Sequence, residues 1–355
     1  MAGRTGLAGR AGWGGRGVGG AGVSRPAVPC YRLAVESFLV RAARDTARVV
    51  VALALALALG AAPGAARAEA PTSAPDFLVD GFEPAGMPGY DILDVARSGV
   101  VGHLRPAFGL ELGYVHGALE VAPPDAPRAV GAELVADRVR ADLVIGVGFF
   151  RRFAVSLGLP FVLMQDGDDL GILNRPGGAV SGAAMGDMRL QIRGQLFEIE
   201  GFGLGLGCEV AFPTGDDDAF LSTGGVRAKP WLALDWRERE SGVVVALNVG
   251  YHALPERFAQ GTAIDDALLW ALALDLPTPV EAVHVLASLT GAVPLGGVED
   301  GGRAEPVSLA GALTVRVSEV TLALGGGAGL TRGIGAPEWR AFIGVAWQPL
   351  FGAKR

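Results

Sequence analysis

Between residues 104 and 349, apolar residues recur at every second position, and this pattern constrains the fold more than any other feature of the chain. Successive side chains of a β-strand point to opposite faces, so a period of two predicts strands with two unlike faces. The clearest stretch is 188–196, where Met, Leu and Ile alternate with Arg and Gln. A helix would not separate these residues in this way.

The alternating pattern repeats about twelve times, separated by Gly-, Pro- and Asp-rich breaks that are typical of turns and loops. We therefore expect strands over approximately 104–118, 138–149, 153–165, 187–198, 202–213, 226–237, 242–252, 266–276, 280–293, 305–317, 320–330 and 338–349.

The lengths of the expected connections alternate along the chain. Short connections follow the even-numbered strands, around Arg151, Glu200, Glu240, Thr278 and Glu319, and longer ones follow the odd-numbered strands. Short turns at one end and long loops at the other are typical of barrels in bacterial outer membranes, where the short turns face the periplasm. In lipid every backbone N–H and C=O must be paired, so a membrane-spanning sheet has to close on itself. The sequence thus predicts an all-β, closed antiparallel transmembrane barrel.

A stretch near the N-terminus predicts export. Residues 49–62 are mostly apolar, follow a group of arginines and precede the small residues Ala66 and Ala68. This order is typical of a secretory signal peptide, here cleaved before Glu69, and the stretch is short for a retained membrane anchor, which is the alternative. We expect four parts: an N-terminal extension and signal peptide (1–68), a periplasmic lead-in segment (69–101), an outer-membrane barrel (102–350) and a tail (351–355).

Charge and cysteine content exclude several functions. Residues 1–68 hold nine of the 30 Lys and Arg and two of the 37 Asp and Glu, so the processed chain carries 21 cations against 35 acids, a net charge of −14. Such a chain would be repelled by phosphate backbones, which argues against nucleic-acid binding. Cys208 would be the only cysteine left, so neither a disulfide within the chain nor a cysteine-based zinc site is expected, and nothing suggests a cofactor.

Polar and charged residues within the expected strands fall on the less apolar face. They would face either a water-filled pore or a closed core of salt bridges, and the sequence leaves both alternatives open. These lumen-facing candidates are Arg105, Glu111, Arg140, Asp142, Arg189, Gln191, Arg193, Gln195, Glu209, Lys229, Asp235, Asp275, His284, Arg316 and Arg340.

The loops contain acidic clusters, of which Asp216, Asp217 and Asp218 are the clearest. Clustered carboxylates can bind divalent cations, but these lack the regular ligand spacing of an EF-hand, and solvated loop tips are the more common outcome. No metal site is therefore assigned. The chain also lacks His-Glu-x-x-His and Gly-x-Ser-x-Gly, so no enzyme is expected and no catalytic residue is assigned.

Three runs of residues resemble the N-terminal barrel region of large OmpA-family outer-membrane proteins. They are 102–109 with Tyr114 after them, 213–221, and 329–337. The resemblance covers about residues 80–350. Members usually continue into calcium-binding repeats and a peptidoglycan-binding domain, and this chain stops at Arg355, so the resemblance implies the membrane half only. It implies a location in the outer membrane of a Gram-negative-type cell envelope, contact with lipid, and assembly by the barrel-assembly machinery.

The sequence therefore predicts an integral outer-membrane barrel with a structural or passive, porin-like role in solute passage. The alternative is a secreted or periplasmic soluble β protein that binds a ligand through its loops.

Overall fold

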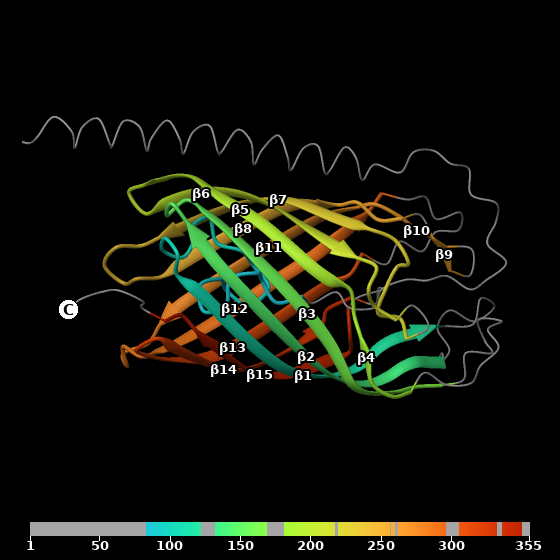
Figure 1. Cartoon of the computed structure of the whole chain (residues 1–355). Coiled ribbons are helices and arrows are strands. Elements are labelled where there is room, and N and C mark those ends of the chain that lie inside the picture. The colour runs from blue at the N-terminus through green and yellow to red at the C-terminus, as the bar shows by residue number, and fades with distance from the viewer. Residues whose placement is uncertain are drawn as a thin grey trace, which may run out of the picture. The chain divides into compact units, whose positions relative to one another are not determined.

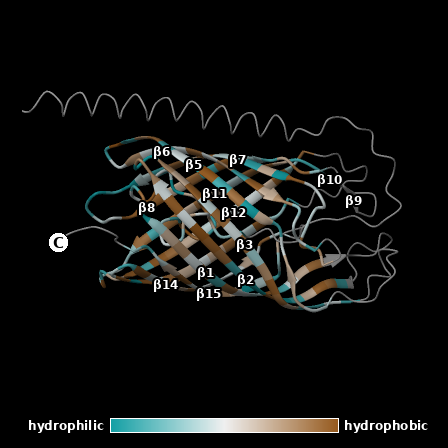
Figure 2. Cartoon of the chain, viewed as in Figure 1, coloured by the Kyte–Doolittle hydropathy of each residue, from teal (hydrophilic) through white to brown (hydrophobic). Residues whose placement is uncertain are grey.

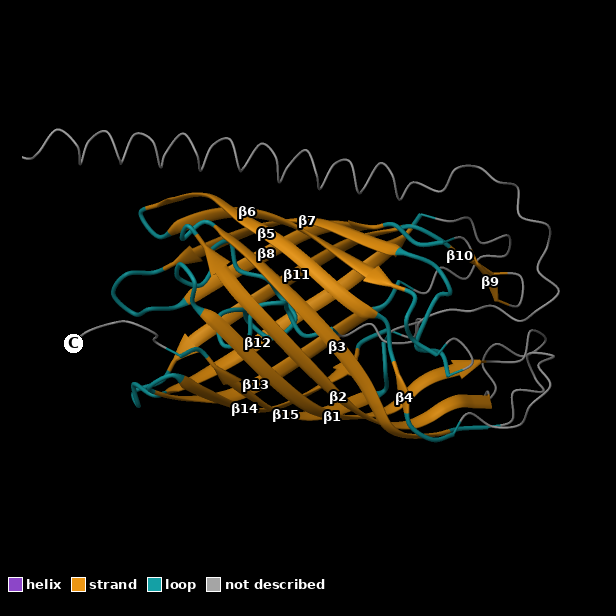
Figure 3. Ribbon diagram, viewed as in Figure 1, coloured by secondary structure: helices purple, strands orange, loops and turns teal. Residues whose placement is uncertain are grey.

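The computed structural model of the chain describes residues 83–121, 132–168, 181–216, 219–255, 257–259, 262–295, 305–331 and 336–349. The expected signal peptide, its cleavage residues Ala66, Ala68 and Glu69, and the tail 351–355 lie outside these ranges. Strands are the only regular elements within them, as Figure 3 shows. In particular, the described ranges hold no helix long and apolar enough to cross a membrane.

Twelve antiparallel strands form a closed ring (Figure 1). Each strand pairs with its neighbours in chain order, and β1 closes the ring by pairing with both β2 and β15. The predicted twelve-stranded barrel is thereby confirmed. The strands are β1 (Pro106–Val121), β2 (Ala132–Phe149), β3 (Phe153–Asp166), β5 (Met188–Ile199), β6 (Phe202–Phe212), β7 (Arg227–Arg237), β8 (Val244–His252), β11 (Ala267–Pro277), β12 (Val283–Pro294), β13 (Val307–Val317), β14 (Val320–Gly329) and β15 (Trp339–Trp347).

Three short strands lie outside the ring. The two-residue strand β4 (Ala184–Met185) pairs with β3, and β9 (Arg257–Ala259) and β10 (Thr262–Ile264) form a small hairpin in the connection after β8. These strands are too short for a period of two to reveal them. β2 also begins at Ala132, six residues before the expected start at 138.

Connection lengths alternate as the sequence predicts. The turns 150–152, 200–201, 238–243, 278–282 and 318–319 join strands at one end of the barrel, which we call the short-turn end. Two of these turns have only two residues, and in one of them Glu200 and Gly201 have φ angles of 52° and 88°. Positive φ at both central residues is typical of a type I′ turn, whose twist matches that of the flanking strands. The longer connections all lie at the opposite end, the long-loop end.

The barrel has an apolar outside and a polar inside, the reverse of a soluble protein. Leucines in the middle of strands are exposed on the outer surface, with Leu324 65% and Leu322 52% exposed, whereas Arg138 and Arg193 in the interior are 0% and 1% exposed. Figure 2 shows the corresponding alternation of hydropathy along the strands. Exposed leucine costs free energy in water but not in hydrocarbon, so this surface suits a lipid bilayer.

Aromatic pairs mark the two borders of the apolar surface. Phe108 stacks on Trp347 near the short-turn end, with ring centroids 5.5 Å apart, and Tyr114 packs on Trp339 toward the long-loop end at 5.1 Å. Trp339 and Trp347 lie eight residues apart on β15, about 26 Å along the strand at roughly 3.3 Å per residue. Because the strands of such barrels are tilted by about 35–45°, this span corresponds to a height of roughly 20 Å, somewhat less than the apolar band of about 25 Å that aromatic residues flank in membrane barrels.

The apolar band predicts that a charged residue on the outer face destabilises the barrel more at the bilayer midplane than near its surface. Leu272 lies at the centre of β11 on the outer face, and Leu276 lies near its short-turn end. Leu272→Arg should destabilise the barrel by about 2–4 kcal/mol, and Leu276→Arg by only about 0–1 kcal/mol, because arginine at the bilayer midplane loses its hydration. Denaturant titration of the protein refolded in lipid vesicles measures both values. Equal costs at the two positions would contradict the lipid-facing assignment.

Candidate functional site

A non-helical segment preceding β1 fills much of the barrel interior. Residues 83–105, drawn in cyan in Figure 1, run inside the ring of strands before the chain enters β1 at Pro106. We call residues 83–101 the plug. The sequence pattern assigned 69–101 to a lead-in segment in the periplasm. The described part of that segment does precede β1, but it lies within the barrel, because its charges and apolar side chains match groups on the inner wall.

The plug is folded locally around one carboxylate. Asp91 accepts hydrogen bonds from the backbone N–H groups of Met87, at 2.9 Å, and Arg97, at 3.0 Å. Between them the backbone N–H and C=O groups of Ile92 and Val95 pair with each other. Leu93 has a positive φ of 57°, and Gly89 one of 71°. The carboxylate thus holds a compact double turn that a period of two cannot predict.

Glu83 joins the plug to a group of cations near the long-loop end of the wall. Its carboxylate contacts the ammonium group of Lys229, and it lies 3.5 Å from Arg189 and 4.0 Å from Arg227. Burial by itself would raise the pKa of Glu83, but the three cations outweigh it and hold the pKa well below its ordinary value. Glu83 is therefore ionised in the docked plug at neutral pH.

Asp91 makes the best-formed ion pair of the plug. Its two oxygens accept hydrogen bonds of 2.8 Å and 2.7 Å from the two terminal nitrogens of Arg193 on β5. Both side chains are nearly fully buried. A bidentate pair of this kind fixes both distance and orientation, so it determines where the plug docks along β5.

Further polar contacts join the plug to the strands β7 and β8. The amide of Ser98 donates a 2.6 Å hydrogen bond to Asp235 on β7, which also lies 3.7 Å from Arg97. Asn248 on β8 pairs with both backbone groups of Ala96, at 2.8 Å and 2.7 Å. The plug therefore satisfies its backbone by bonding to wall side chains, as a buried irregular segment must.

Glycines in the wall let the plug approach closely. A Cβ at Gly203 or Gly205 on β6 would lie 2.1 Å or 2.4 Å from atoms of Ser98, and one at Gly148 on β2 would lie 2.3 Å from the Val101 carbonyl. At Gly148 and Gly205 the opposing atoms are backbone carbonyls, so these positions exclude any side chain, whereas at Gly203 the nearest atom is the Ser98 hydroxyl, which can rotate away. Interior glycines at alternate positions of β2 and β6 are a signal in the sequence for this close approach.

Apolar side chains complete the packing. Ile92 and Val95 are buried against Val244, Leu286 and Phe342, which come from β8, β12 and β15. Nearer the rim, Met87 and Val101 pack with Ala107 and Ala154. Burial of this kind contributes roughly 25 cal/mol per Å² of apolar surface, so the plug is held by packing as well as by charge.

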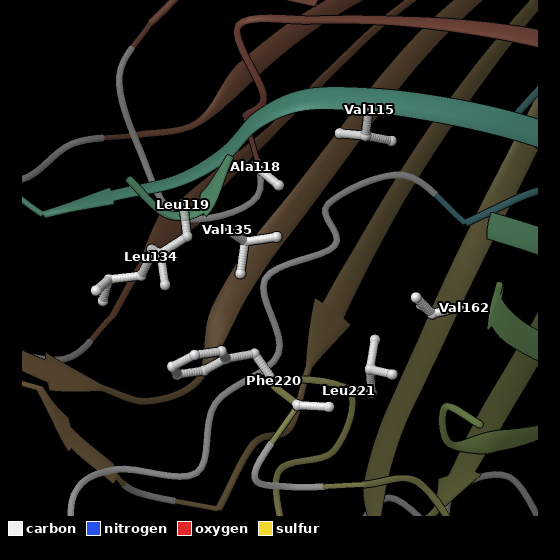
Figure 4. Packing of buried hydrophobic residues seen from close by; sticks show 9 residues of the cluster. Val115, Ala118, Leu119, Leu134, Val135, Val162, Phe220 and Leu221 are labelled. Carbon is white, nitrogen blue, oxygen red and sulfur yellow. The ribbon is translucent and has the colours of Figure 1, made fainter. Parts of the chain in front are cut away.

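A second closure lies toward the long-loop end. Phe220 and Leu221, in the connection between β6 and β7, are 0% and 2% exposed and pack on Leu119, Val135 and Val162 of the wall (Figure 4). Arg138 on β2 donates a 3.3 Å hydrogen bond to the carbonyl of Ala219 in the same connection. We call residues 219–223 the inner loop. In the sequence, residues 213–221 indicated only a family resemblance, and nothing in the pattern showed that part of this run folds into the barrel.

The predicted lumen-facing residues occupy interior or rim positions. Those most deeply buried are Arg140, Asp142, Arg189, Gln191, Arg193, Glu209, Asp235, Asp275 and Arg340. Lys229, His284 and Arg316 form ion pairs or hydrogen bonds with interior carboxylates, whereas Arg105 bonds the Gln348 carbonyl, and Gln195 bonds Glu198, near the short-turn end. Glu111 lines a cavity of about 110 Å³ between the plug and the strands β1 and β12–β15.

The acidic loop candidates are not assembled into a site. Asp216 is exposed and accepts a hydrogen bond from the backbone of Ala219, while Asp217 and Asp218 lie outside the described residues. In the described ranges no three His, Cys, Asp or Glu side chains are grouped so as to hold a metal ion.

The contact between Ser98 and Gly203 predicts a specific cross-link. The Ser98 Cβ lies 3.2 Å from an ideal Cβ at Gly203, close to the separation of about 3.5–4.5 Å in disulfides. With Cys30 and Cys208 replaced by serine, Ser98→Cys with Gly203→Cys should oxidise to a disulfide in membranes, detected by its gel mobility.

The control pair joins Ser98→Cys to Gly344→Cys on β15, which is five strands away from β6 in the ring. This pair should stay reduced. A plug outside the barrel would give no cross-link in either variant, and a mobile one would give both.

Comparison with solved structures places the fold among outer-membrane barrels. The outer-membrane channel of Pseudomonas putida F1 aligns with 72% of this chain and 100% of its own, at 14% identity and a TM-score of 0.52. The NanC porin aligns with 68% of this chain and 100% of its own at 11% identity and a TM-score of 0.47, and the KdgM porin with 69% and 99% at 9% identity and 0.42. No family model and no curated protein sequence matches the chain.

Proposed function

We propose that this protein is an integral outer-membrane channel for passive passage of solutes, closed by its own plug. The observation that carries the proposal is that the charges of the lumen are paired between the wall and a separate segment, as at Asp91 and Arg193, in addition to pairs within the wall. Eight-stranded barrels fill their interior with wall side chains alone. Twelve strands enclose more space, and here a non-strand segment occupies it. Such a segment can leave without breaking the ring of strands.

The membrane location rests on the outer surface of the barrel. Exposed leucines lie between two aromatic pairs on β1 and β15, as in the lipid-facing band of membrane barrels, and the loop asymmetry matches barrels whose short turns face the periplasm. We place the protein in the outer membrane of a Gram-negative-type envelope, with lipid and the barrel-assembly machinery as its partners. Divalent cations bridging the acidic loops to anionic lipid headgroups are part of the same proposal.

The finer family assignment is also a proposal. The run 102–109, which resembles large OmpA-family barrels, contains the exit of the plug into β1, and the run 213–221 contains part of the inner loop. Both runs thus belong to the parts that close the lumen. This supports membership of that group for the barrel.

Two other roles compete with a channel. In the structural alternative, the plug is a permanent part of the core and nothing passes. A catalytic role has less support. A lipase-like couple would join His252 to Ser222 or Ser181, but the buried Nε2 of His252 bonds no partner among the described residues, and Ser222 is 1% exposed with its hydroxyl accepting a hydrogen bond from Gly224. A hydroxyl so placed does not face a lipid substrate, so we assign a non-enzymatic role.

Loosening the plug should open the channel. In planar bilayers the full chain should conduct rarely, whereas Glu83→Gln with Asp91→Asn should raise the open time about tenfold or more, since about 1.4 kcal/mol of lost docking free energy shifts a two-state equilibrium by that factor. Glu240→Gln with Glu281→Gln removes the same charge from exposed turns and should change nothing.

Gel mobility before and after boiling would establish that each of these variants is folded. If the variants are folded and never conduct, the channel function is wrong and the structural role stands.

A further inference from the structure

The plug offsets an excess of positive charge on the wall. Apart from residues at the short-turn rim, such as Arg105 and Glu198, the charged side chains that face the lumen from the wall and the adjoining Asp187 comprise eight cations and six carboxylates among the described residues, a net charge of +2. The plug carries three carboxylates and one cation, a net charge of −2. The cations are Arg138, Arg140, Arg189, Arg193, Arg227, Lys229, Arg316 and Arg340, and the carboxylates are Glu111, Asp142, Asp187, Glu209, Asp235 and Asp275.

Glu83 completes one cluster of this set. Four cations share three wall carboxylates there: Asp142 pairs with Arg140 at 2.7 Å and Arg189 at 3.1 Å, Asp187 with Arg227 at 3.3 Å, and Glu209 with Lys229 at 2.8 Å. Glu83 supplies the fourth carboxylate. When Glu83 leaves, Lys229, Arg189 and Arg227 lose the carboxylate that they share in a poorly solvated lumen.

Arg193 offers a second position for an anion. Its terminal nitrogens hold both oxygens of Asp91, and a guanidinium group recognises any carboxylate or phosphate with the same planar fork. Arg189 and Arg193 lie four residues apart on β5 and face the same side. The two anion positions are therefore about 13 Å apart along one strand, at roughly 3.3 Å per residue.

These arginines also have hydrogen-bonding capacity to spare. The Nε groups of Arg189, Arg193 and Arg227 are buried and donate to no acceptor in the described part of the chain. A buried donor without an acceptor is costly, so an anion with several oxygens would gain by meeting them.

We infer that the open lumen is an anion-selective path, with Arg189, Arg193, Arg227 and Lys229 as its track and with carboxylate-bearing solutes as its preferred class. In the closed state Glu83 and Asp91 occupy the positions that solute carboxylates take in the open one. This inference rests on the proposed channel function. Positive charge lining a narrow, weakly solvated passage concentrates anions and repels cations.

Reversal potentials in a KCl gradient test the inference. Glu83→Gln with Asp91→Asn should give chloride a permeability about threefold above that of potassium. Adding Arg189→Gln and Arg193→Gln should bring the ratio to about one. Adding instead Arg151→Gln and Arg239→Gln, which removes equal charge from exposed turns, should leave it unchanged. Millimolar citrate should reduce the current through the first variant and not through the one lacking the track arginines.

The outcomes separate the two claims. A conducting Glu83→Gln, Asp91→Asn barrel with no preference, or with a preference for potassium, overturns the anion track and leaves the channel standing. The same follows if the turn arginines change selectivity as much as Arg189 and Arg193 do. Folded variants that carry no current at all overturn the channel and the track together.

Discussion

Every backbone polar group of a membrane-spanning sheet must find a partner within the protein, and this requirement governs the rest of the structure. It forces the sheet to close, which the pairing of β1 with both β2 and β15 achieves. Closure in turn fixes one face of every strand toward lipid and the other toward an enclosed space. Once twelve strands surround that space, wall side chains alone no longer fill it, so the lumen has to hold water or another part of the chain.

In this protein it holds the plug, and the plug obeys the same requirement. An irregular segment inside a membrane barrel has no neighbouring strand to accept hydrogen bonds from its amides. Wall side chains accept them instead: Asn248 bonds the backbone of Ala96, and Asp235 bonds the amide of Ser98. Buried ion pairs are weak contributors to stability, because desolvation offsets much of their attraction, but they specify position well. The contacts of Glu83 and Asp91 therefore define where the plug docks, while its apolar contacts supply much of the affinity. In the proposed channel, that division keeps the docked plug ordered and still allows it to leave.

The sequence predicted the barrel well, because period-two alternation is a local property that repeats in every strand. The alternation of Arg189 and Arg193 with leucine and isoleucine was enough to assign the inner face of β5. The plug could not be predicted, because residues 83–101 have no hydrophobic periodicity. Its partners are also far away in the sequence: Ser98 and Asp235 are 137 positions apart. Alternate glycines at Gly203 and Gly205 indicate close approach of another backbone, but only once their inward orientation is known. The inner loop could not be predicted for a similar reason, because Phe220 lies in a stretch whose composition is typical of turns.

The central claim is that residues 83–101 are docked inside the barrel in the membrane. Hydrogen–deuterium exchange of the amides of Ala96 and Ser98, in protein reconstituted in lipid, tests it most directly. Both amides donate to wall side chains, so they should exchange far more slowly than the amide of Arg151 in an exposed turn. Exchange of Ala96 and Ser98 as fast as that of Arg151 would contradict a docked plug.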